Sequence, residues 1–319
     1  MSKITDRIER ELGLPGLVAL LAEGIAPTDL QSLLLEVYRE RARRRKPSDV
    51  LADYRSNRFV RSASLDPARL NEWEGVAFSQ LPPEFELLAL SPLCPLGTNS
   101  VVANVDQNWA VSTVRNTEVV SDSTNVLALE CALRRRQRLR EQPKSTAAVH
   151  LATSHRLVRG QHYEDPRLLS HFSTLVLCSA GRDVGGLQSE LQSLALHARF
   201  YVCALRAFLG SELPLRLSAS DLQEAPREAV VTLQWIEPLR DELRIEGVFD
   251  RERSSGRGYY AGFCFHLQAR APSGRWLELV DGGAVDWTQR LLSDAKERLV
   301  ISGIGSERVC TEFGGHGTG

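Results

Sequence analysis

The chain has 319 residues, of which 43% are hydrophobic and 25% charged, and its formal net charge is −1. These values suit a globular protein with room for one large domain and an appended piece, and they exclude a globally basic nucleic-acid binder. No apolar run approaches the roughly 20 residues of a membrane span, and the charged start is not a signal peptide. The six scattered cysteines lack a C-x-x-C pair, so we expect reduced thiols, no structural zinc and a cytoplasmic location.

Residues 1–62 predict an N-terminal helical module. Leu30, Leu33, Leu34 and Tyr38 recur at helical spacing, and similar leucines precede them. Residues 39–46 hold six basic side chains and one acid. Two interpretations of this run stay open. It is either the solvated C-terminal end of a helix, where cations are favourable, or a contact for tRNA or another polyanion.

The next segment predicts a helix that leads into a strand. Asp66 and Pro67 are typical of a helix start, and Leu70, Trp73 and Phe78 then share one helical face. Two prolines end this pattern. Residues 85–93 form an apolar run of strand length that Pro92 closes.

A polar cluster at residues 121–125 precedes a strongly helical stretch, residues 126–136. Upstream, residues 97–125 are rich in Thr, Ser, Asn and Val, and their side chains alternate in the way that is typical of strands. The Asp and Ser side chains of this cluster can accept hydrogen bonds from the free N–H groups at the start of the helix. The cluster is therefore at least an N-cap.

Two apolar strands around a polar turn predict an antiparallel hairpin within residues 150–183. Arg156 and Arg159 lie near the end of the first strand, and Arg167 and Phe172 lie at the start of the second. Exposed arginines on an ordinary hairpin are the alternative interpretation.

The remaining chain predicts a helix over 187–210 with Gly210 at its end, then a strand near residues 213–217. Arg257, Tyr259 and Tyr260 precede another predicted hairpin, strands 263–267 and 276–280, which is followed by Gly-Gly-x-x-Asp. The last element, residues 299–309, is an apolar strand, a Gly-x-Gly turn and Glu-Arg, with Arg308 after the turn.

Taken in order, these stretches resemble the class II aminoacyl-tRNA synthetases. The helix and strand near residues 66–93 look like motif 1, the hairpin like motif 2, and the final Gly-x-Gly-x-Glu-Arg like motif 3. The Arg-Gly-Tyr-Tyr and Gly-Gly-x-x-Asp stretches resemble the signatures of histidyl-tRNA synthetase. The resemblance implies an α+β fold over residues 63–312, an antiparallel sheet flanked by helices, a homodimer and a flexible tail over 313–319. We expect no anticodon-binding domain.

The resemblance also implies roles for single residues in binding ATP. Arg159 followed by Gln161 matches the family's Arg-x-Glu, with Gln in place of Glu; Arg156 is a second possible register. Arg159 would bind the α-phosphate and Arg167 the γ-phosphate side, while Phe172 and Arg308 would complete the nucleotide site. Arg159 and Arg257 would be the catalytic arginines.

The residues expected to bind the amino acid differ in part from those of histidyl-tRNA synthetase. In the family an acid holds the α-amino group, and Asp122 with Thr124 would take that place, beside Tyr259 and Tyr260. Thr174 and Cys178 stand where the family has Gln and Glu. Because a buried cation without its carboxylate is costly, we expect a smaller or less polar amino acid than histidine.

Two hypotheses about function follow. In the first, the protein binds ATP, Mg²⁺ and an amino acid and forms an aminoacyl adenylate, with a carrier protein, a small molecule or a tRNA as acceptor. In the second, it is a non-catalytic paralogue that regulates or binds, like the regulatory subunit of short-form ATP phosphoribosyltransferase. Retained arginines favour the first, and the altered pocket favours the second.

Overall fold

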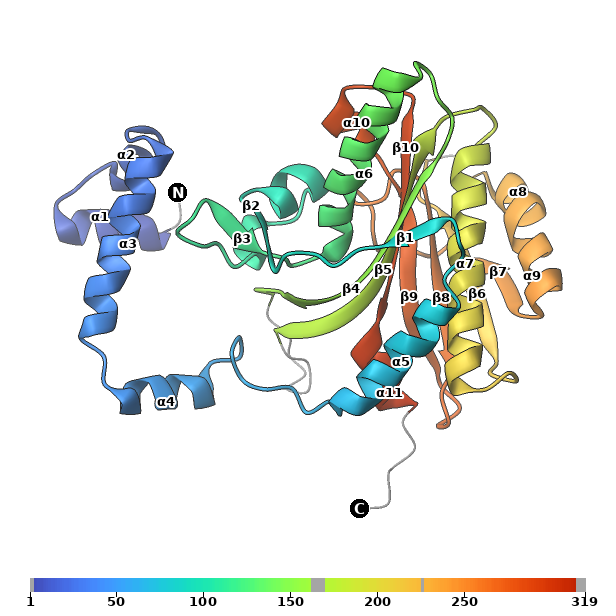
Figure 1. The fold of residues 1–319 in the computed structure, drawn as a ribbon, viewed down its shortest axis with the longest axis horizontal. Coiled ribbons are helices and arrows are strands. Elements are labelled where there is room, and N and C mark those ends of the chain that lie inside the picture. Colours follow the sequence, from blue (N-terminus) through green and yellow to red (C-terminus); the bar gives the residue numbers. More distant parts are fainter. Residues whose placement is uncertain (1–2, 162–169, 225–226, 314–319) are drawn as a thin grey trace.

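The computed structural model describes residues 3–161, 170–224 and 227–313, and within them eight strands form one sheet (Figure 1). Their order is β1-β4-β5-β10-β9-β8-β6-β7. The strands are β1 (Phe85–Leu87), β4 (Val149–Val158), β5 (His171–Arg182), β6 (Leu215–Asp221), β7 (Glu246–Phe249), β8 (Phe263–Arg270), β9 (Trp276–Val285) and β10 (Glu297–Gly305). The six central strands pair antiparallel, and the edge strands β1 and β7 pair parallel with β4 and β6.

Helices cover both faces of this sheet, so the predicted α+β architecture is confirmed. Residues alternate along β5: Leu175 and Leu177 pack with α7, whereas Val176 and Cys178 pack under α6. The helices that follow the N-terminal segment are α5 (Pro67–Ser79), α6 (Ser123–Glu141), α7 (Gln188–Leu209), α8 (Glu228–Val231), α9 (Glu237–Leu243), α10 (Trp287–Leu292) and α11 (Ser306–Glu312). The helices α5 and α11 lie on the α7 face, and α10 lies beside α6.

A buried ion pair fixes α6 to the sheet. Arg135 of α6 donates through Nε and Nη2 to the two carboxylate oxygens of Glu297 in β10, at 2.7 and 2.8 Å, and both side chains are fully buried. Arg135 also donates to the backbone carbonyls of Ser145 and Ala147. The two carboxylate oxygens and the guanidinium are therefore hydrogen-bonded, which is what a buried charge requires.

A chain of side-chain hydrogen bonds crosses the core beneath α7. His150 Nδ1 contacts Ser179 Oγ at 2.7 Å, and Ser179 Oγ contacts His197 Nε2 at 2.8 Å. On its other side, His197 Nδ1 contacts Ser302 Oγ at 2.8 Å, and Ser302 Oγ lies 3.2 Å from the Tyr201 hydroxyl oxygen. Burial lowers the pKa of His197 from 6.5 to about 3, so its ring is neutral near pH 7.

Four helices precede the sheet domain: α1 (Lys3–Leu12), α2 (Leu17–Glu23), α3 (Pro27–Arg43) and α4 (Pro47–Ser56). They confirm the predicted helices, and they lie apart from the sheet in Figure 1. Glu9 is their only buried residue. Its carboxylate accepts hydrogen bonds from the N–H groups of Gly16 and Val18, which holds the corner between α1 and α2.

Two predictions of secondary structure were wrong in extent or type. The strand expected over 85–93 is interrupted: only β1 and the short β2 (Leu93–Pro95) form. The strands expected over 97–125 reduce to β3 (Thr117–Val119), which pairs with β2, because this stretch folds around polar side chains into a π-helical turn, Thr98–Val102, and a 3-10 turn, Gln107–Trp109. For the apolar stretch near 230–239 no element was predicted, and it is helical, comprising α8, the π-helical turn Thr232–Ile236 and the start of α9.

The other predicted elements are confirmed, apart from those outside the described residues. The hairpin forms from β4 and β5, but its polar turn, which includes Arg167, lies outside the described ranges. The same holds for the tail after Phe313. Among the helices of the described ranges, none is both long and apolar enough to cross a membrane.

Replacing Arg135 with Met would leave Glu297 charged and buried without its partner. We expect the free energy of unfolding to fall by about 3–5 kcal/mol. The free energy of unfolding of the double variant Arg135→Met, Glu297→Leu should fall by less, because no charge stays buried. The matched control is Arg134→Met, whose partner Glu86 is largely exposed, with an expected loss of about 1 kcal/mol or less. Urea unfolding measures all three, and equal losses at positions 134 and 135 would contradict the argument.

The low pKa of His197 makes the free energy of unfolding depend on pH. Between pH 6.5 and about pH 3, His197 binds a proton in the unfolded chain but not in the folded protein. The free energy of unfolding therefore declines as the pH falls through this window. The slope from this residue is at most about 1.4 kcal/mol per pH unit. His197→Gln keeps a donor and an acceptor but does not titrate. Its unfolding free energy should depend less steeply on pH between 6.5 and 3, and parallel curves would refute this assignment.

Candidate functional site

The α6 face of the sheet is covered in one half and open in the other. Val149, Leu151, Ala180 and Leu299 lie under α6. Further along the strands, Gly303 pairs with Val176 on one side and with Asp281 on the other, and Asp281 pairs with His266. This second region is polar, and Asp281 is 54% exposed. It is the floor on which most of the predicted site residues come together.

The N-terminus of α6, with its capping residue, lies beside this floor. Asp122 is the N-cap, and its Oδ1 accepts hydrogen bonds from the Thr124 N–H at 3.0 Å and the Thr124 hydroxyl at 2.7 Å. Its other oxygen, Oδ2, accepts from Arg159 Nη2 at 3.0 Å. The acid, the threonine and the first arginine expected from the sequence are therefore in direct contact.

Arg159 follows β4 and is held from two sides. Its Nε donates to the carbonyl of Ser121 at 2.9 Å, and its guanidinium carbon lies 5.3 Å from the centre of the Phe172 ring. Phe172 faces Leu157 across the hairpin and packs with it. Gln161 lies two residues after Arg159, with its carbonyl bound to Arg58, while Arg167 lies outside the described residues.

Arg156, the alternative register, lies on the other face of the sheet. Along β4, Leu151 and Leu157 face the α6 side, whereas Ala152 and Ser154 face the side of α5 and α7. Arg156 belongs to the second set and pairs at 2.9 Å with Glu307 of α11. Of these two arginines, Arg159 is the one that contacts Asp122 beside the open floor.

The two tyrosines close the floor beneath α6. Their rings meet edge-on at 5.0 Å, and Tyr259 also meets Trp287 at 5.4 Å. A side chain at Gly283 would place its Cβ 2.6 Å from Tyr260, so glycine is required for this close approach. Burial and the nearby Asp122 raise the pKa of Tyr259, which Thr124 and Arg159 oppose, so Tyr259 lies beside the α6 cap as a neutral phenol.

Arg253, which sequence reasoning missed, is buried beside Asp281 on the open floor, whereas Arg257 is not. Arg257 is exposed, and within the described ranges its side chain has no hydrogen bond or ion pair. The Arg253 side chain is 3% exposed and donates from Nη2 to Asp281 Oδ1 at 2.8 Å. Its buried Nη1 has no partner among the described residues. The Arg-Gly-Tyr-Tyr spacing drew attention to Arg257, and only burial distinguishes the two arginines.

Thr174 lies on the open floor, but Cys178 does not. Cys178 is fully buried under α6, and its thiol contacts the Thr124 carbonyl at 3.7 Å. Thr174 pairs across the hairpin with His155. The hydroxyl of Thr174 and Nε2 of His155 are both buried and lack a partner among the described residues. His155 had no signal in the sequence beyond its strand parity, and burial lowers its pKa, so it is neutral near pH 7.

Arg308 lies at the end of the floor, at the start of α11. Its Nη1 donates to the carbonyl of Glu278 in β9 at 2.9 Å, and its Cβ lies near Gly305, which pairs with Thr174. The glycine-rich turn therefore brings Arg308 to the strand edge that also holds Thr174 and, two residues earlier, Phe172.

A second network, also missed from the sequence, supports the α6 cap. The fully buried carboxylate of Glu118 accepts hydrogen bonds from the backbone N–H groups of Gly97 and Asn99 and from the side chains of Asn99 and Gln107. Asn99 in turn accepts from Asn125, in the first turn of α6. These bonds position the segment before α6 against the helix that carries Asp122.

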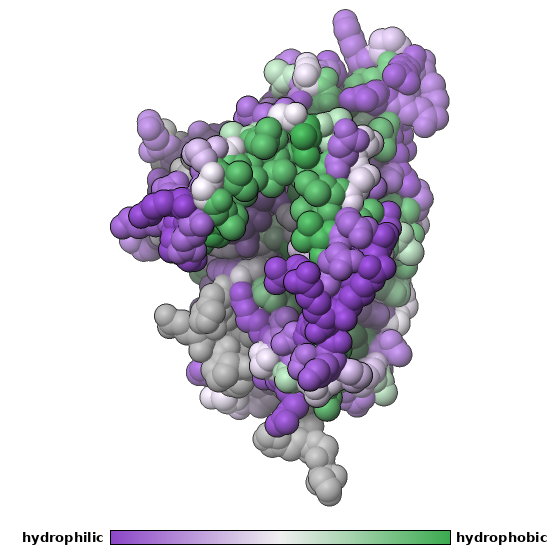
Figure 2. All heavy atoms as spheres, turned by 90° about the vertical axis from the view of Figure 1, so that its left-hand side faces the viewer, coloured by the Kyte–Doolittle hydropathy of each residue, from purple (hydrophilic) through white to green (hydrophobic). Residues whose placement is uncertain are grey.

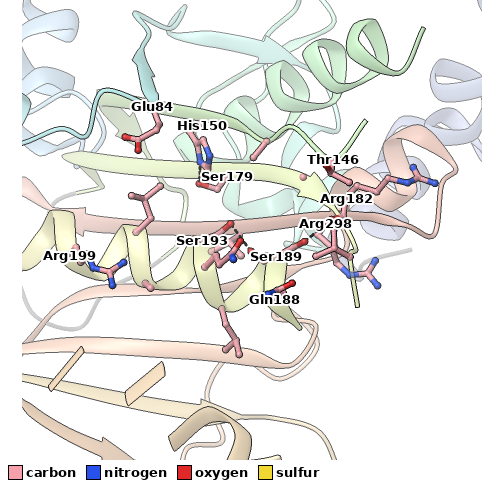
Figure 3. Close-up of a pocket in the computed structure, with 18 of the residues that line it drawn as sticks. Glu84, Thr146, His150, Ser179, Arg182, Gln188, Ser189, Ser193, Arg199 and Arg298 are labelled. Carbon is pink, nitrogen blue, oxygen red and sulfur yellow. Dashed lines mark hydrogen bonds between the residues drawn. The ribbon is translucent and has the colours of Figure 1, made fainter. Parts of the chain in front are cut away.

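A separate cavity of about 600 Å³ lies on the other face of the sheet (Figure 3). It is lined by β4, β5 and α7, with His150 and Ser179 from the hydrogen-bonded chain in its wall, and no predicted site residue lines it. Its arginines, Arg182, Arg199 and Arg298, are each paired with acids. Across the described part of the chain, no three His, Cys, Asp or Glu side chains are grouped to hold a metal ion.

Comparisons with known proteins agree with this fold. Protein-family models and the curated proteins give no match to the chain. A solved structure from Bacillus halodurans, described as an ATP phosphoribosyltransferase regulatory subunit/histidyl-tRNA synthetase, is 12% identical with a TM-score of 0.53, and the match covers 77% of this chain and 80% of that one. Apo histidyl-tRNA synthetase from S. aureus is 15% identical with a TM-score of 0.56, over 78% of this chain and 67% of that one. The chain therefore has the fold of a class II aminoacyl-tRNA synthetase catalytic core, as histidyl-tRNA synthetase and its paralogue have it.

Proposed function

We propose that the protein binds ATP and a small amino acid on the open floor and joins them as an aminoacyl adenylate. The observation that carries this proposal is the direct contact of Asp122, Thr124 and Arg159 at the end of α6, over a floor that also holds Arg253. A carboxylate that can bind an ammonium group and arginines that can bind phosphate therefore lie next to one another.

The reaction would join the carboxylate of the amino acid to the α-phosphate of ATP and release pyrophosphate. Negative charge gathers around the α-phosphate as the new bond forms. Arg159 is fixed by Asp122 and Ser121, and Arg253 is fixed by Asp281 with Nη1 free of partners among the described residues. Preorganised donors of this kind lower a barrier without having to reorganise.

The nucleotide base would lie between Phe172 and Arg308, since a guanidinium and a phenyl ring both stack on an aromatic base. Asp122 still has acceptor capacity for the α-ammonium group, because an ionised carboxylate offers about four lone-pair sites. Thr174 and His155 would contact the side chain of the amino acid through their unpartnered polar atoms. This favours a small, weakly polar side chain over a cationic one.

Mg²⁺ would enter with ATP. The described residues offer no three-ligand cluster, and Mg²⁺ commonly binds through substrate phosphates with one or two carboxylates. We extend the proposal to a homodimeric, cytoplasmic protein whose acceptor is a carrier protein, a small molecule or a tRNA.

One observation favours the alternative, a regulatory or binding subunit without catalysis. Arg159 is already engaged by Asp122 and by the carbonyl of Ser121, so phosphate binding must compete with an existing ion pair. A protein from Bacillus halodurans with this fold is described as an ATP phosphoribosyltransferase regulatory subunit/histidyl-tRNA synthetase. The two functions differ in a measurable property, the exchange of pyrophosphate into ATP.

The first test is pyrophosphate exchange, screened across the common amino acids. We expect exchange with a small amino acid, reduced about 10²–10³-fold in Arg159→Ala and in Arg253→Ala, because each removes a fixed donor to the α-phosphate. Arg257→Ala is the matched control and should retain activity, since that side chain is exposed. No exchange with any amino acid, together with no ATP binding by calorimetry, would remove the enzymatic proposal.

The second test separates the two substrates. Asp122→Asn keeps a good N-cap for α6 but removes the negative charge. We expect the KM for the amino acid to rise about tenfold or more, whereas the Kd for ATP and the melting temperature stay close to wild type. An equal loss of ATP affinity would show that Asp122 acts by holding Arg159 rather than by binding the ammonium group.

A further inference from the structure

Residues 38–61 form a basic segment in a chain whose formal net charge is −1. The segment holds 9 of the chain's 39 Lys and Arg but 3 of its 40 Asp and Glu, which leaves 30 against 37 for the other residues. It runs from the last turns of α3 through α4 to the residues before α5. Figure 2 faces the end of the molecule that carries α3 and shows strongly hydrophilic side chains gathered beside apolar ones. A local excess of positive charge is typical of a surface that binds a polyanion.

Most of this positive charge is available to a ligand. Every basic side chain of the segment except Arg58 is exposed. Among the described residues, the side chains of Arg41, Arg44 and Arg55 have no hydrogen bond or ion pair. Three further arginines pair with acids whose side chains are at least 44% exposed, and such exposed ion pairs are weak. Phosphate groups can therefore compete for these arginines.

A hollow of about 600 Å³ lies between the end of α3 and α4. Its lining combines an aromatic ring with three arginines and one acid; the residues are Tyr38, Arg41, Ala42, Arg44, Arg45 and Asp53. Its volume falls within the roughly 300–1,000 Å³ of ligand-binding clefts. An exposed ring among guanidinium groups can stack on a base while the arginines bind the phosphates beside it.

The types of side chain favour nucleic acid over an anionic membrane. Eight of the nine basic residues are arginine, and Lys46 is the exception. A membrane surface attracts Lys and Arg alike, whereas Arg also binds phosphate through two parallel hydrogen bonds and stacks on aromatic rings. Tyr38 and Tyr54 alternate with these arginines and are 59% and 49% exposed. A duplex hides the faces of its bases, so a single strand is the ligand that uses both the rings and the charges.

The basic segment is fixed to the sheet domain at its C-terminal end. Arg58 donates to the carbonyls of Gly160 and Gln161 at 2.6 and 2.7 Å. The carbonyl of Arg61 contacts His171 in β5. The segment is therefore a positioned surface, and it ends next to the hairpin formed by β4 and β5.

We propose that the basic segment binds single-stranded nucleic acid, with a base stacked on Tyr38 and phosphates held by the arginines of the hollow. The site lies on helices that precede the sheet domain, so it does not follow from the synthetase-like fold. It is also independent of whether the protein forms an adenylate.

Fluorescence anisotropy of the full chain with labelled oligouridylate and oligothymidylate of about 12 nucleotides tests the charge contacts. We expect binding of one or both at 50 mM salt, and with about four phosphate contacts the Kd should rise roughly 50-fold by 200 mM. Arg41→Gln with Arg44→Gln should lower the slope of log Kd against log salt by about 1.4, because two contacts are lost. The matched control is Arg140→Gln with Arg275→Gln. These arginines are exposed on α6 and on the turn between β8 and β9, and the slope should stay at the wild-type value.

The stacking contact is tested with two variants of one residue. Tyr38→Leu should raise the Kd about fivefold or more, because the aromatic ring is lost. Tyr38→Phe keeps the ring, so its Kd should stay within about twofold of wild type. Both variants change an exposed side chain, and their melting temperatures should match that of the wild type.

Four outcomes would overturn the proposal. The first is that neither oligonucleotide binds at 50 mM salt. The second is an equal salt slope in the two double variants, which would put the contact elsewhere. The third is an equal Kd in Tyr38→Leu and Tyr38→Phe, which would leave a surface for phosphate alone. The fourth is tighter binding to a duplex of the same length, or to phosphatidylserine vesicles, than to the single strand. Pyrophosphate exchange is measured without nucleic acid, so failure here does not decide the adenylate proposal.

Discussion

The buried pair of Arg135 and Glu297 determines where everything on the open floor lies. It fastens α6 to β10 across the sheet, with both charges removed from water and both hydrogen-bonded. Because a helix is rigid, fixing one part of α6 also fixes its first turn, where Asp122 and Thr124 lie. The network around Glu118 then positions the chain entering that turn. The position of Asp122 against Arg159 thus depends on the buried carboxylates of Glu297 and Glu118.

The two halves of the α6 face differ for a simple reason of coverage. Where α6 and α10 lie over the strands, the inward residues are aliphatic or cysteine. Where they do not, glycine, threonine, histidine and aspartate appear at the same strand parity. Polar atoms there lie near a surface that a ligand can reach, so an unpartnered Thr174 hydroxyl or Arg253 nitrogen is tolerable. The opposite face is packed against α7 and its neighbours.

The order of elements and the α6 cap could be predicted because local rules govern them. Asp122 before an apolar-periodic run, alternation in β4 and β5, and the glycine turn before Arg308 each act over a few residues. Arg253 and His155 could not be predicted, because their roles come from burial against distant strands. The prediction of strands over residues 97–125 was wrong in extent because threonine and valine are typical of strands. The buried Glu118 carboxylate instead organises this segment into turns.

The chain of hydroxyls and imidazoles beneath α7 couples the tautomers of its two histidines. Ser179 has one hydroxyl proton and lies between His150 Nδ1 and His197 Nε2, so it donates to one neutral ring and accepts from the other. When it donates to His197, both rings carry their hydrogen on Nδ1; when it donates to His150, both carry it on Nε2. In the first arrangement His197 donates to Ser302, and in the second it accepts from Ser302. A change of tautomer at the cavity wall therefore requires the same change at His197 in the middle of the protein.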